Sequence, residues 1–98
     1  MNLEEGRKLI DDLDSEILTL LNRRATLSRR IGRIKMRAGM PIVDRQREEI
    51  VLRRIIRENA GEIDDRALTC IYREILNESR RIQSIVVGEV VVTGDVRT

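Results

Sequence analysis

The sequence predicts an all-α fold, a three-helix chain with a long first helix. Apolar residues recur at helical spacing over most of the chain, and no proline interrupts it before Pro41. Turn-forming residues gather at two interior places, around Gly39 and around Gly61. Charged residues make up 37% of the 98 residues, yet Leu, Ile and Val stay frequent, which indicates a folded helical protein rather than a disordered chain.

The first helix should begin within residues 2–5, where Asn2 can cap it, and run to about Arg37. Gly39 and Pro41 then end it. At about 1.5 Å per residue, this helix is about 50 Å long. A compact chain of similar size has a radius of gyration of only about 13 Å, so the helix extends well beyond the rest of the chain.

An apolar stripe runs along nearly the whole of this helix. At about 100° per residue its members fall on one face, the side expected to be buried. The remainder of the chain is too short to cover a stripe of that length. The sequence therefore predicts a second copy of the chain, most simply in a two-fold homodimer. The stripe contains Ile10, Leu13, Ile17, Leu20, Leu21 and Ile31.

Two shorter helices should follow the loop. Asp44 is placed to cap a second helix over about 45–58, and Asp64 to cap a third over about 65–86. Residues 1–86 thus form one helical domain. The β-branched residues of the tail, residues 87–98, are compatible with a strand, a disordered end or a docking segment.

Composition excludes several kinds of site. The chain has no His, so an imidazole base, a Ser-His triad and a His-ligated metal are absent, and no cluster of metal ligands is apparent. The single cysteine, Cys70, excludes an intramolecular disulfide and fits a reducing cytoplasm. No apolar run approaches the roughly 20 residues of a membrane span. A net charge of +2 is too small to argue for a nucleic acid or a membrane as partner.

Several polar residues lie on faces that should be apolar. Arg24 and Lys35 fall on the stripe of the first helix, where an unpaired cation costs several kcal/mol. A carboxylate of the protein could compensate them, or an anionic ligand could. Glu48, Ser79 and Gln83 also face inward, although Ser79 could simply bond to its own helix and Glu48 could be a favourable first-turn acid. Because cations outnumber acids, the set predicts an acidic ligand with two carboxylates and a hydroxyl.

A set of mostly polar and turn-forming residues lies at specific separations along the chain: Arg7, Leu13 with Asp14, Arg24, Gly32, Lys35, Pro41, Asp44, Arg47 with Glu48, Ser79 and Gln83. In type and spacing this set resembles the all-helical chorismate mutases, from about Gly6 to Gln83. The resemblance implies an intertwined helical homodimer with two identical sites. It also implies the rearrangement of chorismate to prephenate, with no cofactor, no metal and no covalent intermediate.

The resemblance also implies a role for each site residue. Arg24 and Arg7 of the partner subunit would hold the two carboxylates, with help from Ser79. Lys35 and Gln83 would bind the ether oxygen. Glu48, with Asp44 and Arg47 nearby, would bind the ring hydroxyl. Helix geometry supports a contribution of Arg7 from the partner subunit. Arg7 and Arg24 of one chain lie about 25 Å apart along the helix, too far to bind the same small molecule.

Three alternatives remain open. An isochorismate pyruvate-lyase shares the fold, but Glu48 and Asp44 favour the mutase. In a non-catalytic interaction module, Arg24 and Lys35 would form only interfacial ion pairs. A nucleic-acid binder could use the basic residues of 23–37, but interspersed acids and a near absence of aromatic residues argue against it. For the tail we hypothesise docking of another shikimate-pathway enzyme.

Overall fold

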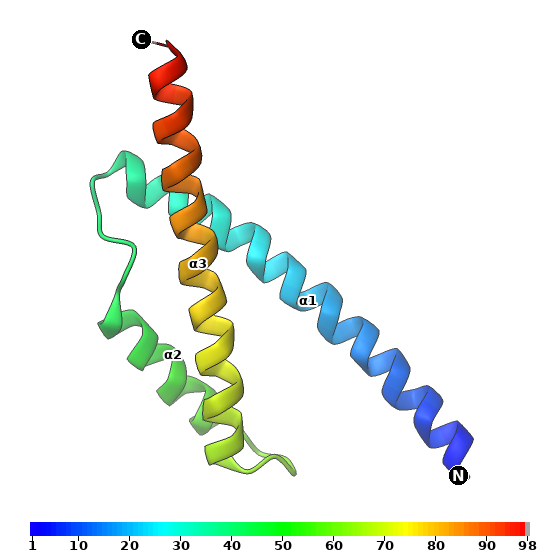
Figure 1. The fold of residues 1–98 in the computed structure, drawn as a ribbon. Coiled ribbons are helices and arrows are strands. Elements are labelled where there is room, and N and C mark those ends of the chain that lie inside the picture. The colour runs from blue at the N-terminus through cyan, green and yellow to red at the C-terminus, as the bar shows by residue number, and fades with distance from the viewer. Residues whose placement is uncertain (98) are drawn as a thin grey trace.

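Three α-helices make up the computed structural model: α1 (Leu3–Arg37), α2 (Arg45–Glu58) and α3 (Asp65–Arg97) (Figure 1). The structure describes the backbone of residues 1–97 and the side chains of residues 1–88. Over that range it contains helices and connecting turns, and no strand. The prediction of an all-α, three-helix chain with a long first helix is confirmed.

Each helix begins at the polar residue that the sequence indicated. Asn2 caps α1 by accepting a hydrogen bond of 2.8 Å from the backbone N–H of Glu5, whose side chain accepts in return from the Asn2 backbone. Asp44 caps α2 by accepting from the backbone N–H of Arg47 at 3.0 Å. Asp64 accepts from the backbone N–H groups two and three residues further on. These bonds satisfy helix-end donors that otherwise lack partners.

The end of α1 agrees with the prediction, whereas the end of α3 does not. α1 ends at Arg37, followed by Gly39 with a φ of 65°, a left-handed conformation that glycine adopts without strain. The expected end of α3 at Val86 is wrong, because the helix continues to Arg97. β-branched residues and glycine lower helix propensity but do not break a helix as proline does. The side chains of 89–98 and the backbone of Thr98 lie outside the described residues.

α3 is the element against which both other helices pack (Figure 1). α2 runs antiparallel to it, and the second half of α1 crosses it, while the first half of α1 extends away from the other two helices. The molecule measures 63 × 28 × 15 Å with a radius of gyration of 17.7 Å. A compact globule of this length would have a value of about 13 Å, so the single chain is markedly elongated.

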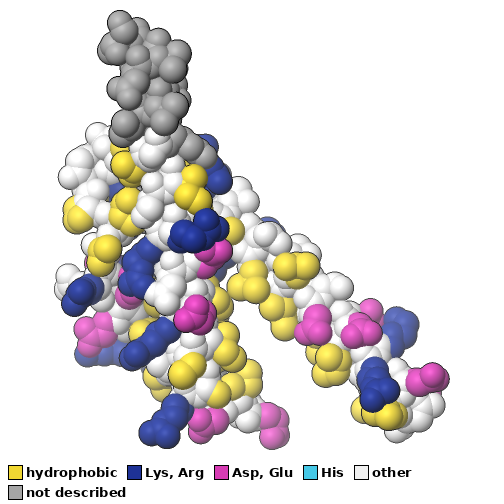
Figure 2. All heavy atoms as spheres, in the orientation of Figure 1, with side chains coloured by type: hydrophobic (Ala, Val, Ile, Leu, Met, Phe, Trp, Pro, Cys, Tyr) yellow, Lys and Arg dark blue, Asp and Glu magenta, His cyan; other side chains and the backbone are white. Residues whose placement is uncertain are grey.

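The core of the single chain is small. Among residues 1–88, the buried apolar side chains are Val51 on α2 and Leu76, Ile82 and Val86 on α3. In contrast, the predicted apolar stripe of α1 is exposed to solvent in the single chain, with Ile10 57% exposed. Hydrophobic side chains line the extended arm of α1 in Figure 2. None of the described helices is long and apolar enough to cross a membrane.

Candidate active site

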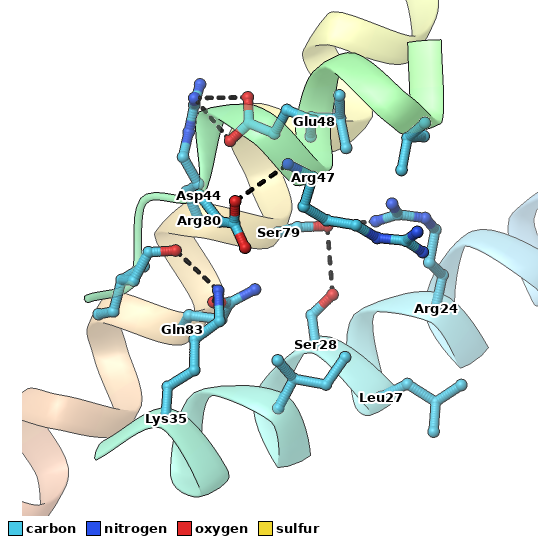
Figure 3. Close-up of a pocket in the computed structure, with 14 residues that line it drawn as sticks. Arg24, Leu27, Ser28, Lys35, Asp44, Arg47, Glu48, Ser79, Arg80 and Gln83 are labelled. Atoms are coloured by element: carbon cyan, nitrogen blue, oxygen red, sulfur yellow. Dashed lines mark hydrogen bonds and ion pairs between the residues drawn. The ribbon is translucent and has the colours of Figure 1, made fainter. Parts of the chain in front are cut away.

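A cavity of about 330 Å³ lies where the three helices meet. The second half of α1, the loop before α2, the start of α2 and the middle of α3 all contribute to it (Figure 3). Its volume is in the range of small-molecule sites. Its polar lining consists of Arg24, Ser28, Lys35, Asp44, Arg47, Glu48, Ser79, Arg80 and Gln83, and its apolar lining of Leu27, Ile31, Ile42, Val51 and Leu76.

At one end, Arg24 of α1 contacts Ser79 of α3. The guanidinium donates to the Ser79 hydroxyl, which also accepts from Ser28 at 3.1 Å. Ser79 in turn donates to the carbonyl of Ile75 at 3.1 Å, the bond to its own helix that a buried serine commonly makes. Within the described part of the chain, no carboxylate pairs with Arg24. Its partly buried positive charge is therefore available to an anionic ligand.

Further along the cavity, Lys35 of α1 meets Gln83 of α3. The Lys35 Nζ donates to Gln83 Oε1 at 2.9 Å and to the carbonyl of Ile42 at 2.8 Å. Both acceptors are neutral, so these bonds orient the ammonium without compensating its charge. Gln83 is 7% exposed, and among the described residues none accepts a hydrogen bond from its amide nitrogen. This end of the cavity thus presents an ammonium and an amide donor side by side.

Gly32 permits this juxtaposition. It is buried one turn before Lys35, and a Cβ on it would lie only 2.9 Å from the Cα of Gln83. Real Cβ atoms do not approach backbone so closely. The absence of a side chain therefore lets α1 and α3 come together at the point where Lys35 and Gln83 meet.

The opposite wall holds the acids. Arg80 Nη1 lies 2.9 Å from Glu48 Oε1 and 3.0 Å from Oε2. Asp44 lines the cavity while it caps α2. The side chain of Arg47 extends toward Arg24 in Figure 3, and no described residue pairs with its guanidinium.

The cavity brings together seven of the eight residues that the sequence indicated: Arg24, Lys35, Asp44, Arg47, Glu48, Ser79 and Gln83. Arg7, the eighth, is exposed near the start of α1 and lines a separate hollow. Within the single chain the structure therefore does not bring Arg7 to this cavity.

Sequence reasoning missed Arg80 and Ser28. Arg80 lies four residues after Leu76 and three before Gln83, so helical spacing places it on the same face as both. Ser28 lies one turn after Arg24 and is 5% exposed. Both could have been found by extending the helical pattern from residues already identified.

The charges of the cavity define what it can bind. Among its described lining residues are four cations, Arg24, Lys35, Arg47 and Arg80, and two acids, Asp44 and Glu48. Within the part of the chain that the structure describes, no group of three or more His, Cys, Asp or Glu could hold a metal ion. The fold and the cavity define an all-helical protein with a cavity whose described lining carries more positive than negative side chains, which suits a small anionic molecule.

Several known proteins are similar to this chain in sequence. The chain is 47% identical over 79 residues to a bifunctional chorismate mutase/prephenate dehydratase of Aquifex aeolicus, covering 76% of this chain. A chorismate mutase of Methanocaldococcus jannaschii is 30% identical, with 83% of each chain covered. A 4-amino-4-deoxychorismate mutase of Streptomyces venezuelae is 31% identical, with 97% of this chain and 93% of that protein covered. The chain spans 22% of the length of the Aquifex relative.

Solved structures of chorismate mutases have the same fold as this chain. Chorismate mutase from Thermus thermophilus (form II) superposes with a TM-score of 0.82 at 33% identity, covering 84% of this chain and 93% of that one. Chorismate mutase from Helicobacter pylori in complex with prephenate gives 0.81 at 32% identity, covering 89% and 94%. The sequence profile of the family described as chorismate mutase type II matches residues 6–84. The chain belongs to the chorismate mutase type II family, which confirms the resemblance.

Proposed function

We propose that this chain is a chorismate mutase, which rearranges chorismate to prephenate in one pericyclic step. The observation that carries the proposal is the pair Lys35 and Gln83 in a cationic cavity of a member of this family. Among the described residues, no acid compensates the charge of Lys35 and no acceptor bonds to the amide N–H of Gln83. Chorismate has two carboxylates, a ring hydroxyl and the ether bond that breaks. The cavity offers complementary groups to each of these parts.

Charge stabilisation supplies one part of the catalysis. Negative charge develops on the ether oxygen as its bond to the ring breaks. The ammonium of Lys35 and the free amide N–H of Gln83 are already oriented before the substrate arrives, so little reorganisation is needed. Such preorganised donors stabilise the transition state more than the ground state.

Conformational restriction supplies the other part. Arg24, with Ser79 beside it, would hold one carboxylate, while Glu48 would accept a hydrogen bond from the ring hydroxyl at the far wall. Asp44 and Arg47 lie beside Glu48 and complete that wall. A substrate held at both ends loses the conformational entropy of its side chain when it binds, so less entropy remains to be lost on reaching the transition state.

The catalytic unit, on this proposal, is a homodimer in which Arg7 of the partner subunit completes each site. The exposed apolar face of α1 supports it, with Leu13 and Ile17 both about half exposed in the single chain. A patch of this extent is unusual on a monomeric protein. Arg7 belongs to the first turns of α1, and the first half of this helix extends away from the other two (Figure 1). A partner that covers this half of α1 could bring its own Arg7 to the cavity.

The direct test is to add chorismate to the purified protein and measure its loss together with the prephenate formed. We expect conversion by the wild-type protein and by Arg23→Ala, and a loss of at least about 100-fold in kcat/KM for Arg24→Ala. Arg23 is the matched control, since it neighbours Arg24 but lines no part of the cavity. No conversion by a folded sample would exclude the mutase and leave the pyruvate-lyase or a non-catalytic interaction module.

A parallel reaction with isochorismate separates the mutase from the pyruvate-lyase on the same fold. Release of pyruvate from isochorismate without conversion of chorismate would identify the lyase. The cytoplasmic location and the docking of another shikimate-pathway enzyme through the tail both stay predictions. Deleting residues 87–98 and finding unchanged kinetics with and without such an enzyme would exclude the docking role.

A further inference from the structure

Arg80 forms an ion pair with Glu48, the acid proposed above to bind the ring hydroxyl of the substrate. Its Nη1 lies 2.9 and 3.0 Å from the two oxygens of Glu48. Its Nη2 donates to the side chain of Asn77, so the guanidinium is fixed from two sides. The side chains of Arg80 and Glu48 are only 34% and 22% exposed, which limits screening of their charges by solvent.

The negative charge of Glu48 is therefore already compensated before a substrate binds. Each carboxylate oxygen can still accept another hydrogen bond, because it has a second lone pair. A neutral hydroxyl can make that bond without adding charge. A protonated amine at the same ring position would instead bring a positive charge close to Arg80, on a cavity wall that also carries Arg47.

This distinction matters within the family. The Streptomyces venezuelae relative is named a 4-amino-4-deoxychorismate mutase, a name that replaces the ring hydroxyl by an amine. Aliphatic amines carry a proton near neutral pH. Two substrates of the same shape thus differ by one positive charge at the group that Glu48 would contact.

We propose, on the basis of the function above, that Arg80 is a specificity-determining residue: its ion pair with Glu48 selects a substrate with a neutral ring hydroxyl and rejects one with an ammonium group there. Removing the charge of Arg80 leaves Glu48 as an uncompensated carboxylate. Such a carboxylate attracts an ammonium group more strongly than a hydroxyl. The variant should therefore gain relative activity toward the amino substrate.

The experiment measures kcat/KM for chorismate and for 4-amino-4-deoxychorismate on the same preparations of wild type, Arg80→Met, Arg80→Lys and Arg81→Met. The ratio of the two values is the readout, because the fraction of folded enzyme cancels from it. Arg81 is the matched control, since it is the next residue, is exposed, pairs with Glu78 and lies outside the cavity. Its substitution removes the same charge from the neighbouring position.

We expect the wild type to prefer chorismate and Arg80→Met to lower that preference by about tenfold or more. Arg80→Lys should keep most of it, and Arg81→Met all of it. If Arg80 were merely structural, kcat/KM would fall in the same proportion for both substrates. An unchanged ratio in Arg80→Met would therefore overturn the proposal. A wild type that converts neither substrate would instead contradict the proposed function, so the two failures are distinguishable.

Discussion

Gly32 and Gln83 face each other across the crossing of α1 and α3, where a Cβ on Gly32 would lie 2.9 Å from the Gln83 Cα and 3.2 Å from its Cβ. The obstacle is backbone, which cannot rotate away as a flexible side chain can. The geometry of the Lys35–Gln83 contact therefore depends on a residue that itself carries no functional group.

Gly32→Ala should lower both stability and turnover. Forcing the helices apart costs about 1–3 kcal/mol, of which the better helix propensity of Ala returns up to about 1 kcal/mol. Displacement of Gln83 should reduce kcat more than it raises KM. Urea unfolding at one protein concentration and steady-state kinetics measure the two effects.

Gly88→Ala is the matched control for this substitution. Gly88 lies in α3 and, apart from its own neighbours along the helix, no described atom is within 4 Å of the position of its missing Cβ. That variant should be as stable as the wild type or more so, with unchanged kcat. Equal stability and turnover in Gly32→Ala and the wild type would show that the close approach is not required.

Lys35→Met should remove the cation proposed to face the ether oxygen. We expect kcat to fall by about 100-fold to 1000-fold, the usual loss for one preorganised donor, with a smaller change in KM. Arg53→Met removes one positive charge from the exposed face of α2, where Arg53 is paired with Glu49, and should leave kcat unchanged. A similar loss in both variants would indicate a general charge effect instead.

Gln83 predicts a specific pH dependence. An amide does not titrate, so the wild type should not lose activity between pH 5 and 8 through this donor. In Gln83→Glu the side chain donates only when protonated, so turnover should fall as pH rises. Initial rates across this pH range, with circular dichroism to verify folding, test the difference. A steep fall in the folded wild type would contradict the assignment of Gln83 to the ether oxygen.

Leu20→Asp should dissociate the proposed dimer. Leu20 is 57% exposed on the apolar face of α1 in the single chain, and burial of a leucine contributes about 1.5–3 kcal/mol. Sedimentation should show a monomer, with loss of activity. Thr19→Asp adds the same charge about 100° away around the helix and should remain dimeric. A wild-type protein that sediments as a monomer would contradict the dimer directly.

Much of the fold could be predicted from local signals. Asn2, Asp44 and Asp64 are side chains whose chemistry suits helix starts, and Gly39 adopts a conformation that suits a helix end. The end of α3 could not be predicted in this way, because residues 87–97 contain no proline, and their two glycines lower helix propensity without ending the helix. Their weak helix propensity was overridden, as propensities often are.

The candidate site was predictable where a polar residue interrupts an apolar face. Arg24, Lys35 and Gln83 stand out for that reason. Arg80 did not, because an arginine on a charged helix looks like a solvated residue until its contact with Glu48 is seen. Helical spacing alone places Arg80 on the same face as Gln83, whereas its pairing with Glu48, a residue of another helix, leaves no local pattern in the sequence.

The most direct test of a site shared between two chains is complementation between Arg7→Ala and Arg24→Ala. Each variant alone should be nearly inactive. When the two are mixed and their chains exchanged, half of the dimers should be heterodimers with one complete site, which restores about a quarter of the wild-type activity. A mixture that stays as inactive as its components, although exchange is verified, would contradict the shared site.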